Sequence, residues 1–337
     1  MIWRWLRWVV VGLAGLYTLS YGVWRILLLS PWYTQFWQLP FSEVFGSWLY
    51  LPLLPLLLLA ILTWNRPAAL LLLLPLCVFA LEYGQQFLPN WQPRAADVAT
   101  VRLLTWNTLA AGDGGGEFQA LVHQLQPDYI AVQEVNFRLV RLFKEKLNGD
   151  YPYQIYNPVG SNGGLALFSR YPLQAVVTPA RLLGCQCMTV ESAIAGRRVT
   201  LIVVHVWRPD LGFTAFPRLA SFSTFDTRYQ TLIFDQLIQR IAAVDGPLVV
   251  MGDFNTGERQ PNYHRLRDFL EDAFAAAGWG MGYTFPANNR LYGWPIPPMV
   301  RIDHILFNPA WQARAAWTGQ LPTSDHGYVV ADLRMRP

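Results

Sequence analysis

A carboxylate and a carboxamide, Asp253 and Asn255, stand two residues apart just beyond a short apolar run at residues 248–251. Four apolar residues that are rich in strand formers, too short for a helix and ended by Gly252 predict a buried β-strand. In an extended chain residues two apart lie on one face, so both side chains should project together while Phe254 turns into the packing. An ordinary turn is the alternative, because Gly, Asp and Asn favour turns for backbone reasons.

The same arrangement, a strand followed by a side chain suited to a metal ion or a phosphate, recurs along the chain. The positions are Asn107, Glu134, His205 and Asp303, together with Asp325 and His326 in the loop that opens the last predicted strand, residues 328–333. Turn preference would explain one such position, but it does not readily explain so many. The sequence therefore predicts one site built from several strand ends.

Residues 101–106, 117–125 and 129–132 are typical of a strand, an amphipathic helix and a second strand. Two strands joined through a helix pair in parallel, so this unit should deliver Asn107 and Glu134 to the same edge of a sheet. Other predicted elements are helices over residues 137–147 and 226–244, a strand ending at 169, a hairpin about Gly196 with strands 188–194 and 199–206, and a strand over 301–307.

Taken in order, these positions resemble the motifs of the endonuclease/exonuclease/phosphatase superfamily. That group includes pancreatic-type deoxyribonucleases, abasic-site nucleases, neutral sphingomyelinases and inositol polyphosphate 5-phosphatases. The matching segments are Trp106-Asn107, Gln133-Glu134, His205, Gly252-Asp253-Phe254-Asn255, Ile302-Asp303-His304 and Ser324-Asp325-His326. The resemblance covers residues 101–333 and is specific because the motifs occur jointly and in order. It implies an α/β fold, a four-layer α/β/β/α sandwich with two sheets face to face, helices outside and an active site at one edge.

The resemblance also implies a divalent metal ion. A phosphate ester is anionic and repels a nucleophile, and hard oxygen ligands select Mg²⁺ or Mn²⁺ over Zn²⁺. Glu134 is expected to be the principal metal ligand, with Asn107 beside it. Asp325 is the next candidate, for a second metal ion or for water.

The remaining motif residues are expected to carry the hydrolysis. Asp253 should orient and deprotonate the attacking water, while Asn255 donates a hydrogen bond to charge that builds on the phosphoryl oxygens. His326 should contact the phosphate as an imidazolium held by Asp303. His205 should contact the phosphate or act as the acid for the leaving group.

Other polar residues have weaker motif support. Asn162 and Arg208 are candidate substrate contacts, and Glu191 is a candidate to orient His205. His304 follows Asp303 in a strand and should point to the opposite face. His123 and His264 match no motif and are expected to be surface or packing residues.

Three apolar stretches precede this region, at residues 8–29, 44–64 and 68–88, and each is long enough to cross a hydrocarbon layer of roughly 30 Å. They predict three transmembrane helices. A secretory signal is the alternative for the first, which however is long and lacks a small-x-small cleavage site, and buried soluble helices are the alternative for the others. The expected domains are therefore a membrane domain over residues 1–91, a linker over 92–100 and a catalytic domain over 101–337.

Arginine positions favour one orientation of these helices. Arg4, Arg7 and Arg66 fall on one side of the membrane, whereas Arg25 and Arg94 fall on the other with the catalytic domain. The positive-inside bias then predicts a cytoplasmic N-terminus and, after three crossings, an extracytoplasmic catalytic domain of a bacterial inner-membrane protein.

Charge and cysteine usage narrow the function. Three of the 22 acidic and five of the 26 basic residues precede Val98, which leaves 19 and 21 in the second part, so its surface is not that of a nucleic-acid-coating protein. Cys185 and Cys187 are too few for a structural zinc site, and are either two buried residues on one strand face or an unusual local disulfide outside the cytoplasm.

The resulting hypothesis is a membrane-anchored, Mg²⁺-dependent phosphoric ester hydrolase whose substrate is a phosphate near the bilayer, a phospholipid or a polyprenyl pyrophosphate. Some bacterial members of the superfamily with similar membrane helices act on lipid-linked phosphates. One alternative is an exported nuclease that degrades DNA, because it would use the same catalytic residues. The other is a catalytically inactive membrane protein that binds a partner or a lipid headgroup, which would require the loss of a motif residue.

Overall fold

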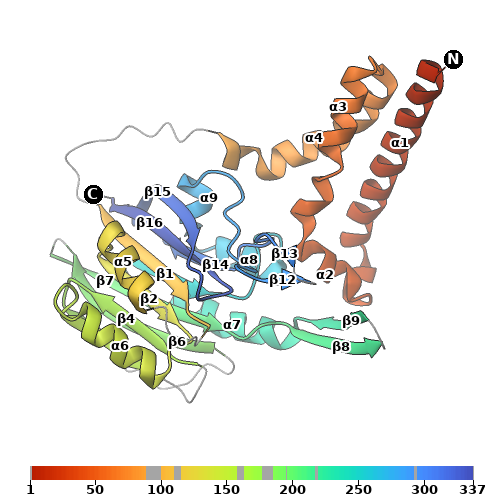
Figure 1. Cartoon of the computed structure of the whole chain (residues 1–337). Helices are drawn as coiled ribbons and strands as arrows, with labels where there is room; N and C mark the ends of the chain where they lie inside the picture. Colours follow the sequence, from red (N-terminus) through yellow and green to blue (C-terminus); the bar gives the residue numbers. More distant parts are fainter. Residues whose placement is uncertain are drawn as a thin grey trace. The chain divides into compact units, whose positions relative to one another are not determined.

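The computed structural model describes residues 2–88, 100–109, 115–157, 163–176, 185–194, 196–216, 219–291 and 294–336 (Figure 1). The chain divides into two compact units, one formed by Met1–Leu88 with Asp210–Asp226 and the other by Pro89–Pro209 with Thr227–Pro337. The sequence predicted a catalytic domain over residues 101–337, and it did not predict that Asp210–Asp226 belongs to the first unit. Thr100 is the one residue of the expected linker, 92–100, that lies within the described ranges.

The first unit consists of apolar helices and one hairpin. Its elements are α1 (Ile2–Leu28), η1 (Pro31–Thr34), α2 (Gln38–Val44), η2 (Gly46–Tyr50), α3 (Leu53–Leu62), α4 (Arg66–Tyr83), η3 (Gly84–Phe87), β8 (Asp210–Phe216) and β9 (Leu219–Asp226). Large apolar side chains on the helices are exposed, among them Leu81 at 87%. An exposed apolar surface of this size is typical of a site of interaction with another protein or a membrane.

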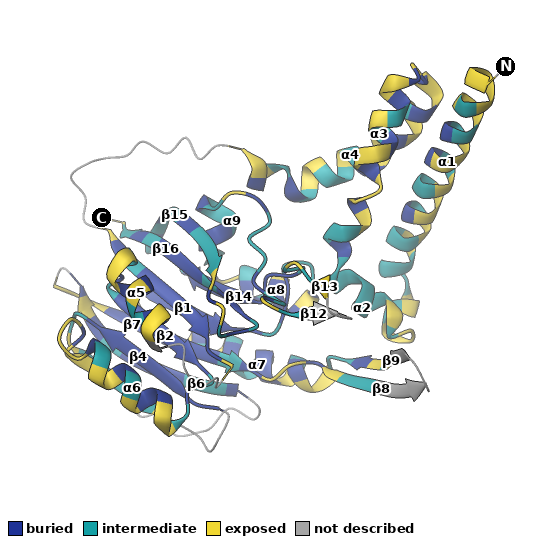
Figure 2. Cartoon of the chain, viewed as in Figure 1, coloured by how far each residue is buried: buried dark blue, intermediate teal, exposed yellow. Residues whose placement is uncertain are grey.

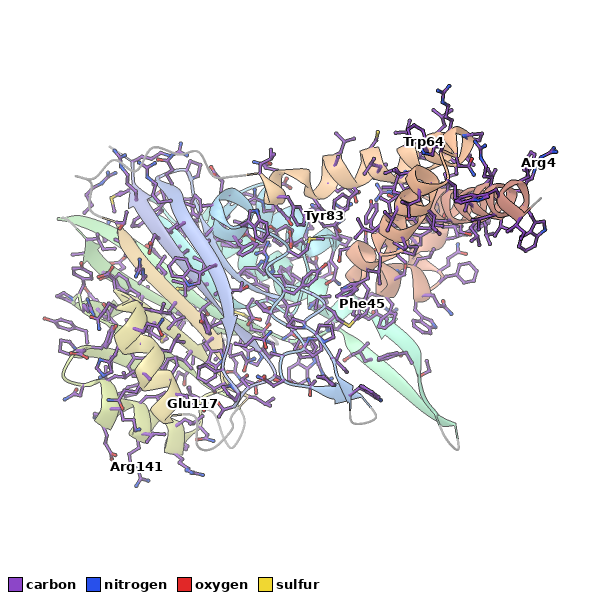
Figure 3. All side chains as sticks on the ribbon, turned by 45° about the horizontal axis from the view of Figure 1, so that its top comes forward. Arg4, Phe45, Trp64, Tyr83, Glu117 and Arg141 are labelled. Carbon is purple, nitrogen blue, oxygen red and sulfur yellow. A yellow bond between two sulfur atoms is a disulfide. The ribbon has the colours of Figure 1, made fainter. Side chains whose placement is uncertain are left out.

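Two of these helices, α1 and the α4–η3 helix Arg66–Phe87, are long and apolar enough to cross a membrane. The third candidate is a pair of helices, Gln38–Val44 and Gly46–Leu62, that meet at 77°, so the stretch predicted over residues 44–64 begins at this bend. Within that stretch the structure has two helices, η2 and α3, rather than one. Gly46 begins η2 and Pro52 directly precedes α3, and both are poor residues for a helix interior. Arg4 and Trp64 lie together at one end of these helices, and Phe45 and Tyr83 lie toward the other (Figure 3).

The second unit is built on two six-stranded sheets. The first sheet has the order β15 (Trp311–Gln320), β16 (Gly327–Met335), β1 (Val101–Asn107), β2 (Tyr129–Gln133), β4 (Leu165–Ser169), β3 (Tyr153–Asn157). The second has the order β11 (Glu271–Asp272), β14 (Asp303–Phe307), β10 (Leu248–Asp253), β7 (Arg197–Val206), β6 (Cys185–Ile194), β5 (Leu173–Ala175). The other elements are helices α5 (Gly115–Leu125), α6 (Phe137–Leu147), α7 (Arg228–Ala242), α8 (Pro261–Arg267) and α9 (Ala273–Ala277), and strands β12 (Arg290–Leu291) and β13 (Trp294–Pro295).

Three hydrophobic clusters hold these layers together. The central cluster lies between the sheets and includes Leu103 and Met251. A second joins α5 and α6 to the first sheet, with the rings of Phe118 and Phe143 in tilted contact at 4.8 Å, and a third joins α7 to the second sheet. Figure 2 shows the corresponding pattern, with buried strands and helices that are exposed only on their outer faces. The expected α/β/β/α sandwich is thus confirmed.

Most of the predicted elements are present. Strands β1 and β2 pair in parallel through α5, and α6 has the predicted bounds. The start of the long helix α7 was predicted wrongly at residue 226, because Asp226 pairs with Asp210 in hairpin β8–β9 and the helix begins at Arg228.

Candidate active site

Strand β10 carries the centre of the site. Its last residue, Asp253, is opposite His205 on the parallel strand β7 and opposite Asp303 on the antiparallel strand β14. Register partners in a sheet project to the same face, with neighbouring strands roughly 4.8 Å apart. Local strand pairing alone therefore brings two carboxylates and an imidazole together.

Gly252 lets strand β10 approach β7 at this point. Its φ is +148°, and a Cβ atom built on it would lie 1.9 Å from the carbonyl oxygen of Val204. No side chain fits at that distance, since the obstacle is backbone rather than a movable side chain.

We therefore expect Gly252→Ala to lower the free energy of unfolding by about 2 kcal/mol or more, because strands β7 and β10 must separate to admit a methyl group. Thermal unfolding of the full-length protein measures this. Gly149→Ala is the control, because nothing lies within 4 Å of its added Cβ. Equal melting temperatures for the two variants would contradict the explanation.

The facing sheet contributes Asn107 and Glu134. Asn107 ends β1 beside Gln133, the last residue of β2, and Glu134 follows in a left-handed conformation with φ +56°. The Nδ2 group of Asn107 donates to Oε1 of Glu134 at 3.2 Å and to Oδ2 of Asp253 at 2.9 Å. Buried Asn107 thus joins the two sheets across the site, and the predicted pairing of Asn107 with Glu134 at one sheet edge is confirmed.

Asp253 is held by several donors. Besides Asn107, the backbone N–H of Asn255 donates to its Oδ1 at 2.8 Å and the Nδ2 group of Asn255 to its Oδ2 at 3.2 Å. The pKa of Asp253 is raised, chiefly because burial disfavours its charged form, although His326 and His205 oppose this. A fixed carboxyl with a raised pKa is suited to accept a proton from water.

Asn255 lies beside Asp253, just beyond the end of strand β10. It has φ +48°, and its Nδ2 group donates to the carbonyl oxygen of Val206 at 2.9 Å as well as to Asp253. Both amide hydrogens therefore face protein acceptors, and the contact with Asp253 fixes the orientation of that carboxyl. Phe254 is fully buried, as its place in the alternation predicted.

His326 and Asp303 form a buried pair. Nδ1 of His326 lies 3.0 Å from Oδ2 of Asp303, and its Nε2 lies 3.8 Å from Oδ2 of Asp253. Burial alone would lower the pKa of His326, but the carboxylates of Asp303 and Asp253 outweigh it and raise the pKa to about 10. The loop is fixed by Ser324, whose hydroxyl donates to the carbonyl oxygen of Asn107 at 2.7 Å and accepts from the N–H of His326 at 3.0 Å.

His205 lies on the other side of Asp253. Its Nε2 is 3.6 Å from both Oε1 of Glu134 and Oδ2 of Asp253. The suggestion that Glu191 orients His205 was wrong: Glu191 is opposite Thr200 and lies 3.8 Å from Arg198. The residue opposite His205 on strand β6 is Gln186, whose Oε1 is buried without a hydrogen-bond partner.

The remaining candidates differ in their placement. Asp325 is partly buried, and its pKa is raised by burial and further by the carboxylates of Glu134 and Asp303. Its Oδ1 atom is buried with no hydrogen-bond partner. Arg208 is exposed, and Asn162 lies outside the described residues.

The histidines without a motif role lie elsewhere. His304 is buried among Arg301, Asp272 and Thr256, on the opposite side of β14 from Asp303 as expected. His123 is half exposed and lies 3.4 Å from Asp150, and His264 is exposed on α8.

An ionic network under the site was not predicted. Arg301 is completely buried, and it donates to Oδ2 of Asp272 at 2.7 Å and lies 3.2 Å from Glu258. The network reaches the site through His304, whose Nε2 lies 3.0 Å from the carbonyl oxygen of Thr256, three residues after Asp253. The available signal was the arginine directly before Ile302-Asp303-His304, since a charge next to a buried strand requires a counter-charge.

Cys185 and Cys187 form a disulfide, which was the second of the two interpretations considered. Cys77 is a free, exposed cysteine of the apolar unit.

Sequence and structure comparisons agree with this geometry. A sequence model of the endonuclease/exonuclease/phosphatase family matches residues 104–326. None of the curated proteins matches significantly. Among solved structures, an endonuclease/exonuclease/phosphatase from Beutenbergia cavernae DSM 12333 is 22% identical, with a TM-score of 0.53 over 70% of this chain and 72% of that one.

Two further structures show the same fold at lower identity. An endonuclease/exonuclease/phosphatase family protein from Bacteroides thetaiotaomicron is 13% identical, with a TM-score of 0.54 over 71% of this chain and 99% of that one. D. rerio TDP2, complexed with a single-strand DNA product, is 15% identical, with a TM-score of 0.53 over 70% of this chain and all of that one. These likenesses establish the fold, and the family match spans the site from its first sheet to His326: the chain belongs to the endonuclease/exonuclease/phosphatase family.

Proposed function

We propose that the protein is a membrane-anchored hydrolase of phosphoric esters that uses Mg²⁺ or Mn²⁺ and acts on a phosphate near the bilayer, a phospholipid or a polyprenyl pyrophosphate. The observation that carries the reaction class is the meeting of Asn107, Asp253 and His326 across two facing sheets. The observation that favours a lipid substrate is the pair of long apolar helices in the same chain.

The donor set fits a hard divalent cation. Glu134 and Asp325 are carboxylates whose charges disfavour each other, and Oδ1 of Asp325 is a buried acceptor without a hydrogen-bond partner. A cation would satisfy that oxygen and relieve the repulsion. We assign Glu134, Asn107 and Asp325 as its ligands. When bound, the ion would neutralise the charge on the phosphate and make the phosphorus atom more electrophilic.

Asp253, Asp303 and His326 also lie close enough to hold a metal ion, with one donor atom from each within 4.8 Å of the others. We prefer a proton-transfer role for them. Nδ1 of His326 is held by Asp303 at 3.0 Å and its Nε2 lies 3.8 Å from Asp253, so the pair is placed to hold and pass a proton beside the attacking water.

The reaction then follows from the positions of the side chains. Burial raises the pKa of Asp253. Its carboxylate accepts a proton from the attacking water while the oxygen of that water forms a bond to phosphorus. The His326 imidazolium, held by Asp303, stabilises the negative charge that develops on the phosphoryl oxygens. His205 donates a proton to the departing oxygen as its bond to phosphorus breaks. Exposed Arg208 is assigned to bind the substrate's anionic group, as is Asn162.

The disulfide supports an extracytoplasmic catalytic unit, because such bonds persist in oxidising compartments. We expect the bond to be present in protein taken directly from cells. Alkylation of free thiols during lysis, followed by mass spectrometry, should label Cys77 and leave Cys185 and Cys187 unlabelled. Quantitative labelling of all three cysteines would contradict the extracytoplasmic assignment and favour a reducing compartment.

A substrate panel tests the proposal. Detergent-solubilised full-length protein with Mg²⁺ is incubated with phospholipids, lipid phosphates and polyprenyl pyrophosphates, and released phosphate or headgroup is measured beside Asp253→Asn and beside samples with EDTA. Release that requires both Asp253 and the metal ion is expected for at least one lipid. No release above the variant, combined with nicking of plasmid DNA at low salt, would overturn the lipid assignment in favour of a nuclease.

A further inference from the structure

Hairpin β8–β9 interrupts the catalytic sequence at a specific place. It begins five residues after His205 and ends two residues before α7. The hairpin is part of the compact unit formed by the apolar helices, and not of the compact unit that holds the active site. The apolar unit is therefore joined to the catalytic unit through both ends of this hairpin, in addition to the chain that follows η3.

The hairpin packs on α2 through aromatic side chains. The ring of Phe41 lies 4.8 Å from Phe222 and 5.6 Å from Phe225, measured between centroids. On α2 itself, Phe41 also contacts Trp37 at 5.9 Å and Phe45 at 5.4 Å. We call these five residues the aromatic cluster. Edge-to-face and tilted contacts at such distances stabilise the packing of hairpin on helix.

The aromatic cluster lies near the end of the apolar helices that carries the Arg25–Glu82 ion pair. Arg25, in the last turn of α1, pairs at 2.6 Å with Glu82 near the end of α4, and the Tyr50 hydroxyl donates to Glu82 at 2.8 Å. Charged groups avoid the hydrocarbon, and aromatic rings gather where it meets the headgroups. The ion pair and the aromatic cluster both indicate that this end of the helices lies at a membrane–water interface.

Both chain connections of the hairpin are held to backbone next to the active site. Gln230 on α7 is buried, and its Nε2 group donates to the carbonyl oxygens of Trp207 at 3.1 Å and Asn255 at 2.9 Å. This clamps the segment before the hairpin, and the helix after it, to the loop that follows Asp253.

We propose that hairpin β8–β9 is an interfacial element that lies against the headgroup layer and confines the active site to phosphate groups displayed on the bilayer. The inference rests on the proposed function and adds to it the structural element that restricts hydrolysis to lipid presented at the interface. Trp207, between His205 and the hairpin, is 55% exposed and, with exposed Arg208, offers an aromatic and a cationic contact to a lipid headgroup.

Two variants separate this role from a structural one. The first is Phe222→Asp, which places a charge in the aromatic cluster. The second replaces residues 212–224 by Asn-Gly, which shortens the hairpin to a two-residue turn; Leu211 and Phe225 are register partners, so the chain can close there. Phe269→Asp is the matched control, an exposed phenylalanine on the catalytic unit.

Full-length proteins are reconstituted in phosphatidylglycerol–phosphatidylethanolamine vesicles that carry the lipid substrate found in the panel, and each is also assayed with water-soluble bis(4-nitrophenyl) phosphate. We expect both hairpin variants to lose at least about tenfold in rate on the vesicle substrate and to stay within about twofold of the wild type on the soluble ester. Phe269→Asp should match the wild type on both. Parallel loss on both substrates, or no loss on either, overturns the inference.

A second readout needs no lipid substrate and so distinguishes failure of this inference from failure of the proposed function. In a Cys77→Ser background, a nitrobenzoxadiazole label is attached to Phe222→Cys or to Phe269→Cys in vesicles that contain spin-labelled lipids. Stronger quenching at residue 222 is expected. Equal quenching at the two positions contradicts an interfacial hairpin even if the protein hydrolyses lipids.

Discussion

Replacing Asp253 by asparagine should lower kcat for phosphoester hydrolysis by about 10³-fold, while leaving the fold intact. The carboxyl is the buried group with a raised pKa at the centre of the site, and general-base catalysis contributes roughly 10²–10⁴-fold. Asparagine has nearly the same shape but cannot take up the proton of the attacking water. Steady-state rates of the full-length protein with saturating Mg²⁺ measure the effect.

Two controls accompany this variant. Asp245→Asn removes a carboxylate from an exposed position just before the same strand and should retain wild-type activity. Thermal unfolding should show Asp253→Asn folded, although an amide must now face the donors Asn107 and Asn255. Retention of more than about a tenth of the activity would exclude Asp253 as the base.

Replacing Arg301 by methionine should lower the free energy of unfolding by about 3–5 kcal/mol, because the buried Asp272 carboxylate would lose its main counter-charge. Both side chains are completely inaccessible to solvent. Arg301 also lies over the ring of Phe274 at 4.9 Å, and methionine replaces much of that apolar contact. The measurement is chemical unfolding, with Arg141→Met on exposed α6 as the control (Figure 3).

Asp272→Asn should also lower the free energy of unfolding. The double variant Arg301→Met/Asp272→Asn should lose less of that free energy than the two single variants combined, because neither charge is then left without its partner. Burial by itself would raise the pKa of Asp272, but Arg301 and His304 outweigh it and hold the pKa well below its usual range. A depressed carboxyl pKa contributes stability that is complete above the unfolded-state value of about 3.9 and is lost as the pH falls through the folded-state value.

The difference in stability between the wild type and Asp272→Asn should therefore be constant from pH 7 to pH 5 and narrow only in strong acid. Additive single effects, or a difference that already narrows at neutral pH, would contradict the assigned ion pair. Either variant should also lower activity, since the network holds the Thr256 carbonyl oxygen through His304 just after the loop that carries Asp253.

The parts of the site that could be predicted are those set by local rules. Asp253 with Asn255, and Asn107 with Glu134, follow from strands that end in polar residues and from a strand–helix–strand unit that must pair in parallel. The buried layers follow from apolar alternation in the same way. The pairing of His326 with Asp303 came instead from the family resemblance, because the two lie 23 residues apart and only the packing joins them.

The features that the sequence did not predict depend on strand register and on tertiary contacts. The residue opposite His205 is set by the loop between β6 and β7: Ile194 pairs with Arg197, and this two-residue connection makes Gln186 the partner. The Arg301–Asp272 pair joins segments 29 residues apart. The role proposed for hairpin β8–β9 rests on contacts with Phe41, which lies in the apolar unit and far away in sequence.

The most direct test of a divalent-cation site formed by the strand ends is metal binding itself. Electron paramagnetic resonance of Mn²⁺ titrated into the full-length protein in detergent should show saturable binding that Mg²⁺ displaces. Glu134→Gln should weaken that binding at least about tenfold, whereas Glu145→Gln on exposed α6 should not change it. Equal Mn²⁺ affinity in the two variants, or no saturable binding in the wild type, would contradict the assignment of Glu134, Asn107 and Asp325 as a metal site.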